Sequence, residues 1–63
     1  MNGELKALID LIKANKTKNV LEVLVLVDEY WKETTFSVLK DEWNKNMTFD
    51  QQRQFILKVQ KEK

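Results

Sequence analysis

The sequence contains one glycine, Gly3, and no proline. Small β-rich domains need tight turns, and the turns of short hairpins depend on Gly, Asn or Asp residues with positive φ. Connections between helices can be built from residues such as Asn, Lys and Thr. The near absence of glycine and proline therefore predicts an all-α protein.

The length of 63 residues limits the chain to one small domain, expected to span residues 1–63. A single core in a chain shorter than about 70–80 residues supplies only about 3–5 kcal/mol of stability. The absence of cysteine and histidine excludes disulfides and ordinary zinc sites as a further source of stability. Efficient packing, to which the large aromatic residues contribute, or association with another chain has to supply the rest.

Apolar residues at helical spacing predict a first helix between Asn2 and Asn15. Asn2 is expected to be its N-cap, and Asn15 is expected to end it in the left-handed conformation. The polar residues 15–19 that follow are expected to form a loop. The apolar face of this helix consists of Leu5, Leu8, Ile9, Leu11 and Ile12.

Residues 19–31 predict a second helix, with Asn19 and Glu22 forming a capping box at its start. The alternative is an α+β fold with a short hairpin over residues 20–39, because four of the eight residues from 20 to 27 are valine. The helix is favoured, since its apolar residues recur three and four positions apart. Its expected core face consists of Val20, Val23, Leu24, Val27, Tyr30 and Trp31.

Two further helices complete an expected compact bundle of three to four short helices. Thr34 or Thr35 is expected to cap a helix that runs to Asn46, with Phe36, Leu39, Trp43 and Met47 on its core face. The segment from Thr48 to Gln51 matches a capping box, so a last helix is expected to begin at Phe49 and to run toward Lys61. Its core face is expected to comprise Phe49, Phe55, Ile56 and Val59.

Catalytic chemistry has no recognisable carrier in this sequence. Histidine and cysteine are absent, and Ser37 is the only serine. The adjacent carboxylate pairs Asp28/Glu29 and Asp41/Glu42 would point about 100° apart on a helix, so neither pair converges on one atom. We therefore expect a non-enzymatic protein with no catalytic residues, no cofactor, no metal and no small-molecule substrate.

The amino-terminal residues 1–6 lack the basic and apolar regions of a signal peptide. The longest unbroken apolar run, from Val23 to Val27, is far shorter than the roughly 18 residues of a membrane span. We therefore expect a cytoplasmic protein without a membrane partner.

Protein binding is the function that the remaining apolar residues favour. Leu21, Val25 and Leu26 lie off the core face of the second helix, and an apolar surface of this kind is typical of an interface. Tyr30 or Trp31 would be the aromatic anchor. The expected protein is a small regulatory binding module, with a homodimer or a larger protein as its partner.

The alternative is a small helix-turn-helix-like DNA- or RNA-binding regulator. Gln51, Arg53 and Gln54 at the start of the last helix are residue types that contact base edges. Basic residues elsewhere would contact the phosphate backbone: Lys13, Lys16, Lys18 and Lys58. The adjacent Asp50 and an isoelectric point near 8.0 make this reading less favoured than protein binding.

Overall fold

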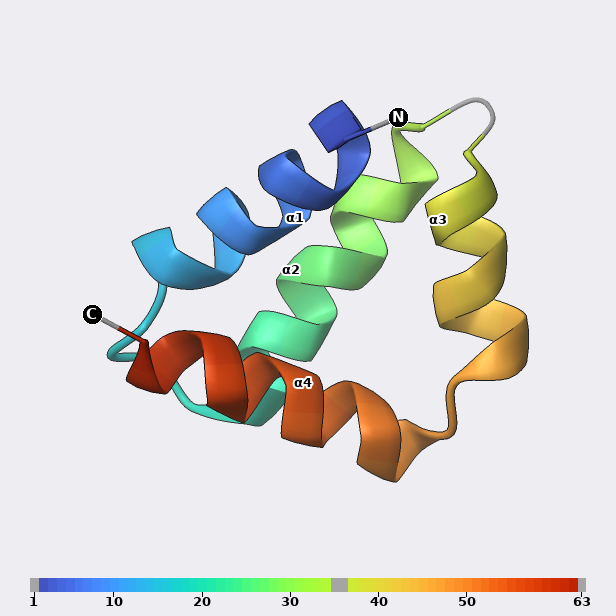
Figure 1. The fold of residues 1–63 in the computed structure, drawn as a ribbon. Helices are drawn as coiled ribbons and strands as arrows, with labels where there is room; N and C mark the ends of the chain where they lie inside the picture. The colour runs from blue at the N-terminus through green and yellow to red at the C-terminus, as the bar shows by residue number, and fades with distance from the viewer. Residues whose placement is uncertain (1, 35–36, 63) are drawn as a thin grey trace.

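A computed structural model describes residues 2–34 and 37–62, and all regular structure within them is helical. The all-α prediction is confirmed, and the alternative hairpin over residues 20–39 is wrong because residues 20–32 form a helix. Helix α2 runs through the middle of the molecule, with α4 crossing it and α3 on the opposite side from α1 (Figure 1). The elements are α1 (Asn2–Ala14), α2 (Val20–Lys32), α3 (Val38–Asp41), the π-helical turn η1 (Glu42–Asn46) and α4 (Phe49–Lys61).

The predicted caps of α2 and α4 are present. The side-chain oxygen of Asn19 accepts a hydrogen bond from the Leu21 N–H at 2.8 Å, although no reciprocal bond from Glu22 occurs among the described residues. At α4 the complete capping box forms: Thr48 Oγ1 accepts from the Gln51 N–H at 3.1 Å, and Gln51 Oε1 accepts from the Thr48 N–H at 2.8 Å. Local sequence therefore sets where both helices begin.

The end of α1 differs from the prediction. No described residue has a positive φ, so Asn15 does not adopt the left-handed conformation. Its side-chain amide instead donates a hydrogen bond to the Leu11 carbonyl at 2.8 Å, which satisfies one of the last free carbonyls of the helix. Helix α1 already includes Asn2, and the side chain expected to cap the helix there lies outside the described part of the structure.

The start of α3 also differs. Ser37, not Thr34, is the N-cap, and its hydroxyl oxygen accepts a hydrogen bond from the Lys40 N–H at 3.1 Å. The Thr34 hydroxyl donates to the Tyr30 carbonyl at 3.0 Å and so belongs to the end of α2. Thr35, the other expected cap, and Phe36, an expected core residue, lie outside the described residues.

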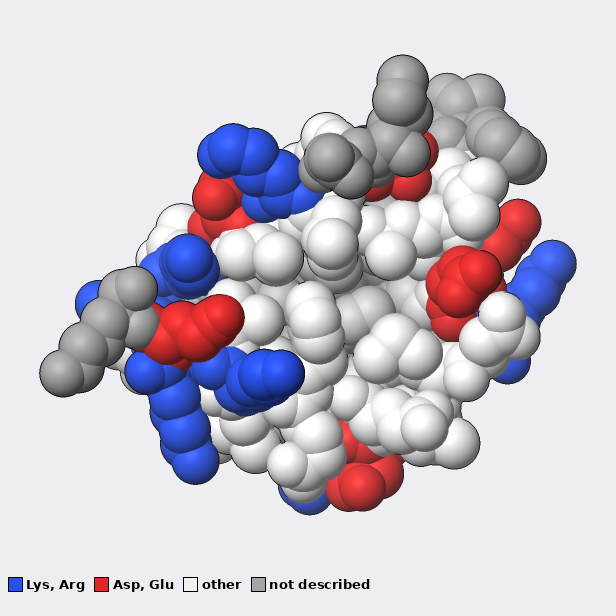
Figure 2. Space-filling model, in the orientation of Figure 1, with Lys and Arg blue, Asp and Glu red and all other residues white. Residues whose placement is uncertain are grey.

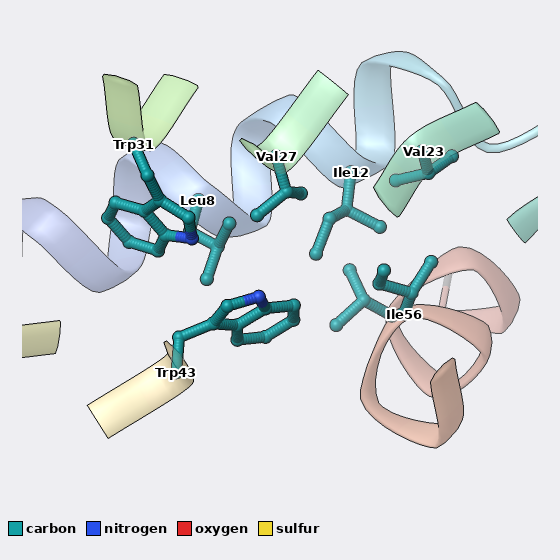
Figure 3. Packing of buried hydrophobic residues seen from close by; sticks show 8 residues of the cluster. Leu8, Ile12, Val23, Val27, Trp31, Trp43 and Ile56 are labelled. Carbon is teal, nitrogen blue, oxygen red and sulfur yellow. The ribbon is translucent and has the colours of Figure 1, made fainter. Parts of the chain in front are cut away.

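The core is formed where α1, α2 and α4 meet, and Trp43 extends into it from η1 (Figure 3). The Trp43 ring meets the Phe55 ring edge-on, with 5.7 Å between the ring centroids. The Gln52 side-chain amide donates to the Trp43 carbonyl at 2.7 Å, linking the π-helical turn to α4. The buried apolar residues are Leu8, Ile12, Val23, Val27, Trp31, Trp43, Ile56 and Val59.

Two expected core residues lie mainly at the surface. Phe49 is 60% exposed and Leu5 is 43% exposed, so both predictions of burial are wrong. Phe49 lies two turns from Ile56 on the core side of α4, but the first turn of α4 extends beyond α1 and α2 (Figure 1). Helical spacing identifies the side of a helix that faces the core, whereas burial also requires a neighbour at that level.

Candidate binding surfaces

The outer face of α2, defined here by Leu21 and Val25, is an apolar surface on the described part of the protein. The two side chains lie one helical turn apart and are 55% and 60% exposed. The capped start of α2 at Asn19 fixes the helical phase that turns them away from the core, since Val23 and Val27 face inward. The sequence-predicted interface is therefore exposed at these two positions.

Charged side chains border this apolar pair. Glu22 and Glu29 are exposed on one flank of it. Further along the same side of the helix, Asp28 and Lys32 form an ion pair at 3.4 Å, which leaves little net charge there. The outer face of α2 thus combines two apolar side chains with a net acidic border.

The other three residues of the predicted interface do not share this exposed face. Leu26 and Tyr30 are half-buried, and Tyr30 packs against the core. Trp31 is only 2% exposed, so the prediction that it anchors a surface contact is wrong for the protein as folded. Its position four residues after Val27 places its ring in the core, where the ring centroid lies 5.0 Å from that of Tyr30.

A second surface, which we call the basic end, comprises Lys13, Lys16, Lys18, Lys58 and Lys61. All five side chains are exposed. The side-chain amide of Gln60 joins their two segments by donating to the main-chain oxygens of Asn15 at 3.2 Å and Lys18 at 3.1 Å. Figure 2 shows basic side chains gathered where α1 and α4 end. The end of α4, which carries Lys58 and Lys61, is thus held against the loop that carries Lys16 and Lys18.

The residues predicted to contact bases have other roles or positions. Gln51 belongs to the capping box of α4, and Arg53 pairs with Asp50 at 3.3 Å. Gln54 is exposed one turn before Lys58, on the outer side of α4. Of the three residues predicted to contact bases, only Gln54 lies next to a residue of the basic end, Lys58.

Sequence reasoning missed two features of these surfaces. Val38, at the start of α3, is 63% exposed, and Ser37 beside it is buried. The role of Ser37 could have been found from its place directly before Val38, Leu39 and Lys40, since serine is a preferred N-cap. Lys61 was not among the four lysines predicted to contact phosphate, although the Gln60 hydrogen bonds hold the end of α4 that carries it against the α1–α2 loop.

The described residues contain no group of three or more acidic side chains placed to hold a metal ion. The Ser37 hydroxyl donates to the Glu4 carboxylate, which leaves it engaged in structural contacts. Within the described ranges, no helix has both the length and the apolar character required to cross a membrane. Comparisons of this chain with protein-family models, with curated proteins and with solved structures find no match.

Proposed function

We propose that this chain is a non-enzymatic protein-binding module that contacts its partner through the outer face of α2. The observation that supports the proposal most directly is the exposure of Leu21 and Val25, side by side on a helix whose opposite face forms the core. Isolated apolar residues are common on protein surfaces, whereas adjacent ones supply a contact that excludes water. The cytoplasmic location expected from the sequence is part of the same proposal.

The acidic border determines which kind of partner fits this face. Both subunits of a symmetric dimer use the same surface. In a contact between two copies of α2, Glu22 and Glu29 of one copy would therefore lie close to the same acidic residues of the other. Like charges brought together across an interface disfavour the complex. We therefore propose a partner with a basic amphipathic helix or segment, and the predicted homodimer becomes the competing outcome.

The test uses a synthetic amphipathic helix with leucine on one face and lysine on both flanks. We expect it to bind the protein and to shift the amide resonances of α2 residues in a titration followed by NMR. A second peptide with glutamate in place of lysine is the charge control and should not bind. Equal binding of both peptides, or shifts confined to other helices, would contradict the proposal.

Variants make the test specific for this face. Leu21→Gln with Val25→Gln removes the apolar pair and keeps good helix formers. Each side chain should contribute about 1 kcal/mol when its exposed part is covered, so the double variant should bind about 30-fold more weakly. Phe49→Gln is the matched control, because Phe49 is equally exposed on a different helix. Its affinity should be unchanged.

Sedimentation at several concentrations tests self-association separately. With a basic partner as the proposed ligand, the protein alone should sediment as a 7.5 kDa monomer. A dimer that dissociates in the Leu21→Gln/Val25→Gln variant would show instead that a second copy occupies this face.

A further inference from the structure

We propose that the basic end binds the phosphate backbone of duplex nucleic acid, independently of sequence. This surface is distinct from the outer face of α2. It is assembled from two segments about forty residues apart, which the Gln60 hydrogen bonds to Asn15 and Lys18 hold against each other. A site built in this way needs no helix-turn-helix and no contact with base edges.

The lysines of the basic end are not accounted for by ion pairs within the protein. The ion pairs among the described residues are Lys6–Asp10, Lys32–Asp28 and Arg53–Asp50, and none includes a lysine of the basic end. Glu62, directly after α4, is an acidic residue beside this group and offsets part of its charge. The basic end therefore retains a net positive charge that can attract an anion.

Helix dipoles explain only part of this arrangement. Lys13 lies in the last turn of α1, and Lys58 and Lys61 lie in the last turn of α4, where a positive charge is favourable. Lys18 instead directly precedes Asn19, the N-cap of α2, where a positive charge meets the positive end of the helix dipole. Its presence there does not stabilise α2, which favours a role in binding.

The surroundings of the basic end favour nucleic acid over a membrane surface. Membrane-surface helices combine basic residues with large apolar residues on the same helix. The outer stripe of α4 is polar, with Gln54, Lys58 and Lys61 at helical spacing. The large apolar residues exposed in the described ranges are Leu5, Leu21, Val25, Val38 and Phe49. Of these, only Leu21 lies in a turn next to the basic end.

The same residues favour a duplex over a single strand. Single strands are held mainly by stacking of their bases on aromatic side chains. Phe49, the exposed aromatic residue of α4, lies in its first turn, at the opposite end from Lys58 and Lys61. The basic end thus offers exposed lysines of two segments, away from the exposed aromatic ring of α4.

The experiment measures binding of the full chain to a short labelled DNA duplex by fluorescence anisotropy. We expect affinity to fall steeply with salt, by about 150-fold between about 50 and 200 mM if four phosphates are contacted. Unlabelled duplexes of unrelated sequence should compete equally. Binding that is absent at low salt, or that does not change with salt, overturns the proposal.

Two pairs of substitutions locate the contact. Lys16→Gln/Lys18→Gln changes the loop, and Lys58→Gln/Lys61→Gln changes α4. Each pair should weaken binding at least about tenfold and make the logarithmic salt slope shallower by about 1.8. Lys32→Gln/Lys45→Gln removes the same charge elsewhere and should change affinity less than about twofold. Circular dichroism first confirms that each variant is folded. Equal losses of affinity in all three variants would then overturn the proposed location of the contact.

Competing ligands complete the test. Vesicles containing phosphatidylserine should bind more weakly than the duplex, and tighter vesicle binding would overturn nucleic acid as the ligand. A single strand of equal length should also bind more weakly. Because Leu21 and Val25 are unchanged in these variants, failure here leaves the protein-binding proposal intact.

Discussion

The hydroxyl of Ser37 donates a hydrogen bond to the carboxylate of Glu4, which lies 33 residues earlier in the chain. The same hydroxyl oxygen accepts from the Lys40 N–H and thereby caps α3. The Glu4 carboxylate also accepts from the Leu39 N–H at 3.4 Å. One buried serine thus both begins α3 and attaches it to the first turn of α1.

Ser37→Ala should lower the free energy of unfolding by about 1–2 kcal/mol, because it removes a helix cap and leaves two part-buried polar groups, the Glu4 carboxylate and the Lys40 N–H, without this partner. Urea unfolding followed by circular dichroism measures the loss. Thr17→Ala, in the exposed loop after α1, is the control and should change stability by less than about 0.5 kcal/mol. Equal stability of the two variants would contradict the linking role of Ser37.

Thr48→Ala should cost about 1 kcal/mol of stability, because the capping box of α4 loses the acceptor for the Gln51 N–H. Gln51→Ala should cost less, and the double variant should lose less than the sum since the two side chains act together. Chemical denaturation of the two single variants and the double variant gives the free energies of a double-mutant cycle, which measures the coupling between the two side chains. Gln54→Ala, on the outer side of the same helix, should be neutral or slightly stabilising.

Val25→Glu should leave the domain folded, with a loss of stability below about 0.5–1 kcal/mol, because that side chain faces solvent. Val27→Glu should unfold the chain, since it would bury an unpaired charge in the core. Far-ultraviolet circular dichroism separates the two results. Unfolding of the Val25 variant would mean that the outer face of α2 is part of the core.

Trp31→Phe should destabilise the protein by only about 1 kcal/mol, although Trp31 is almost fully buried. Its indole Nε1–H has no hydrogen-bond partner in the described structure, and an unsatisfied buried donor costs about 1–3 kcal/mol. Removing this donor offsets part of the lost packing. Trp31→Ala should cost about 3–5 kcal/mol because it leaves a cavity. Thermal unfolding measures the stability of the Trp31→Phe and Trp31→Ala variants. Similar losses of stability in the two would contradict the role given to the unpaired indole N–H.

Features that depend on neighbouring residues in the sequence were predicted well. The caps at Asn19 and Thr48 involve partners two or three residues away, so their sequence contains the information needed. The inward positions of α2 were also correct, because Val23, Val27 and Trp31 follow helical spacing. The choice between helix and strand for residues 20–27 rested on the same periodicity, which outweighed the valine content.

Features that depend on distant residues were not predictable in the same way. The contact between Ser37 and Glu4 joins two helices 33 residues apart in the sequence, which no local pattern contains. The π-helical turn brings Trp43 into contact with Phe55 of α4, a relationship that periodicity within one segment does not contain. The basic end likewise depends on Gln60 reaching the α1–α2 loop.

The position of α4 has a consequence for the order of events during synthesis. Ile56 and Val59 belong to the core that α4 shares with α1 and α2, yet they follow Val20, the first residue of α2, by 36 and 39 positions. At translation rates of about 5–20 residues per second, these two residues are therefore made about 2–8 s after the start of α2. Until then Leu8, Ile12, Val23 and Val27 lack the contacts of the last helix, and their burial is complete only when α4 docks.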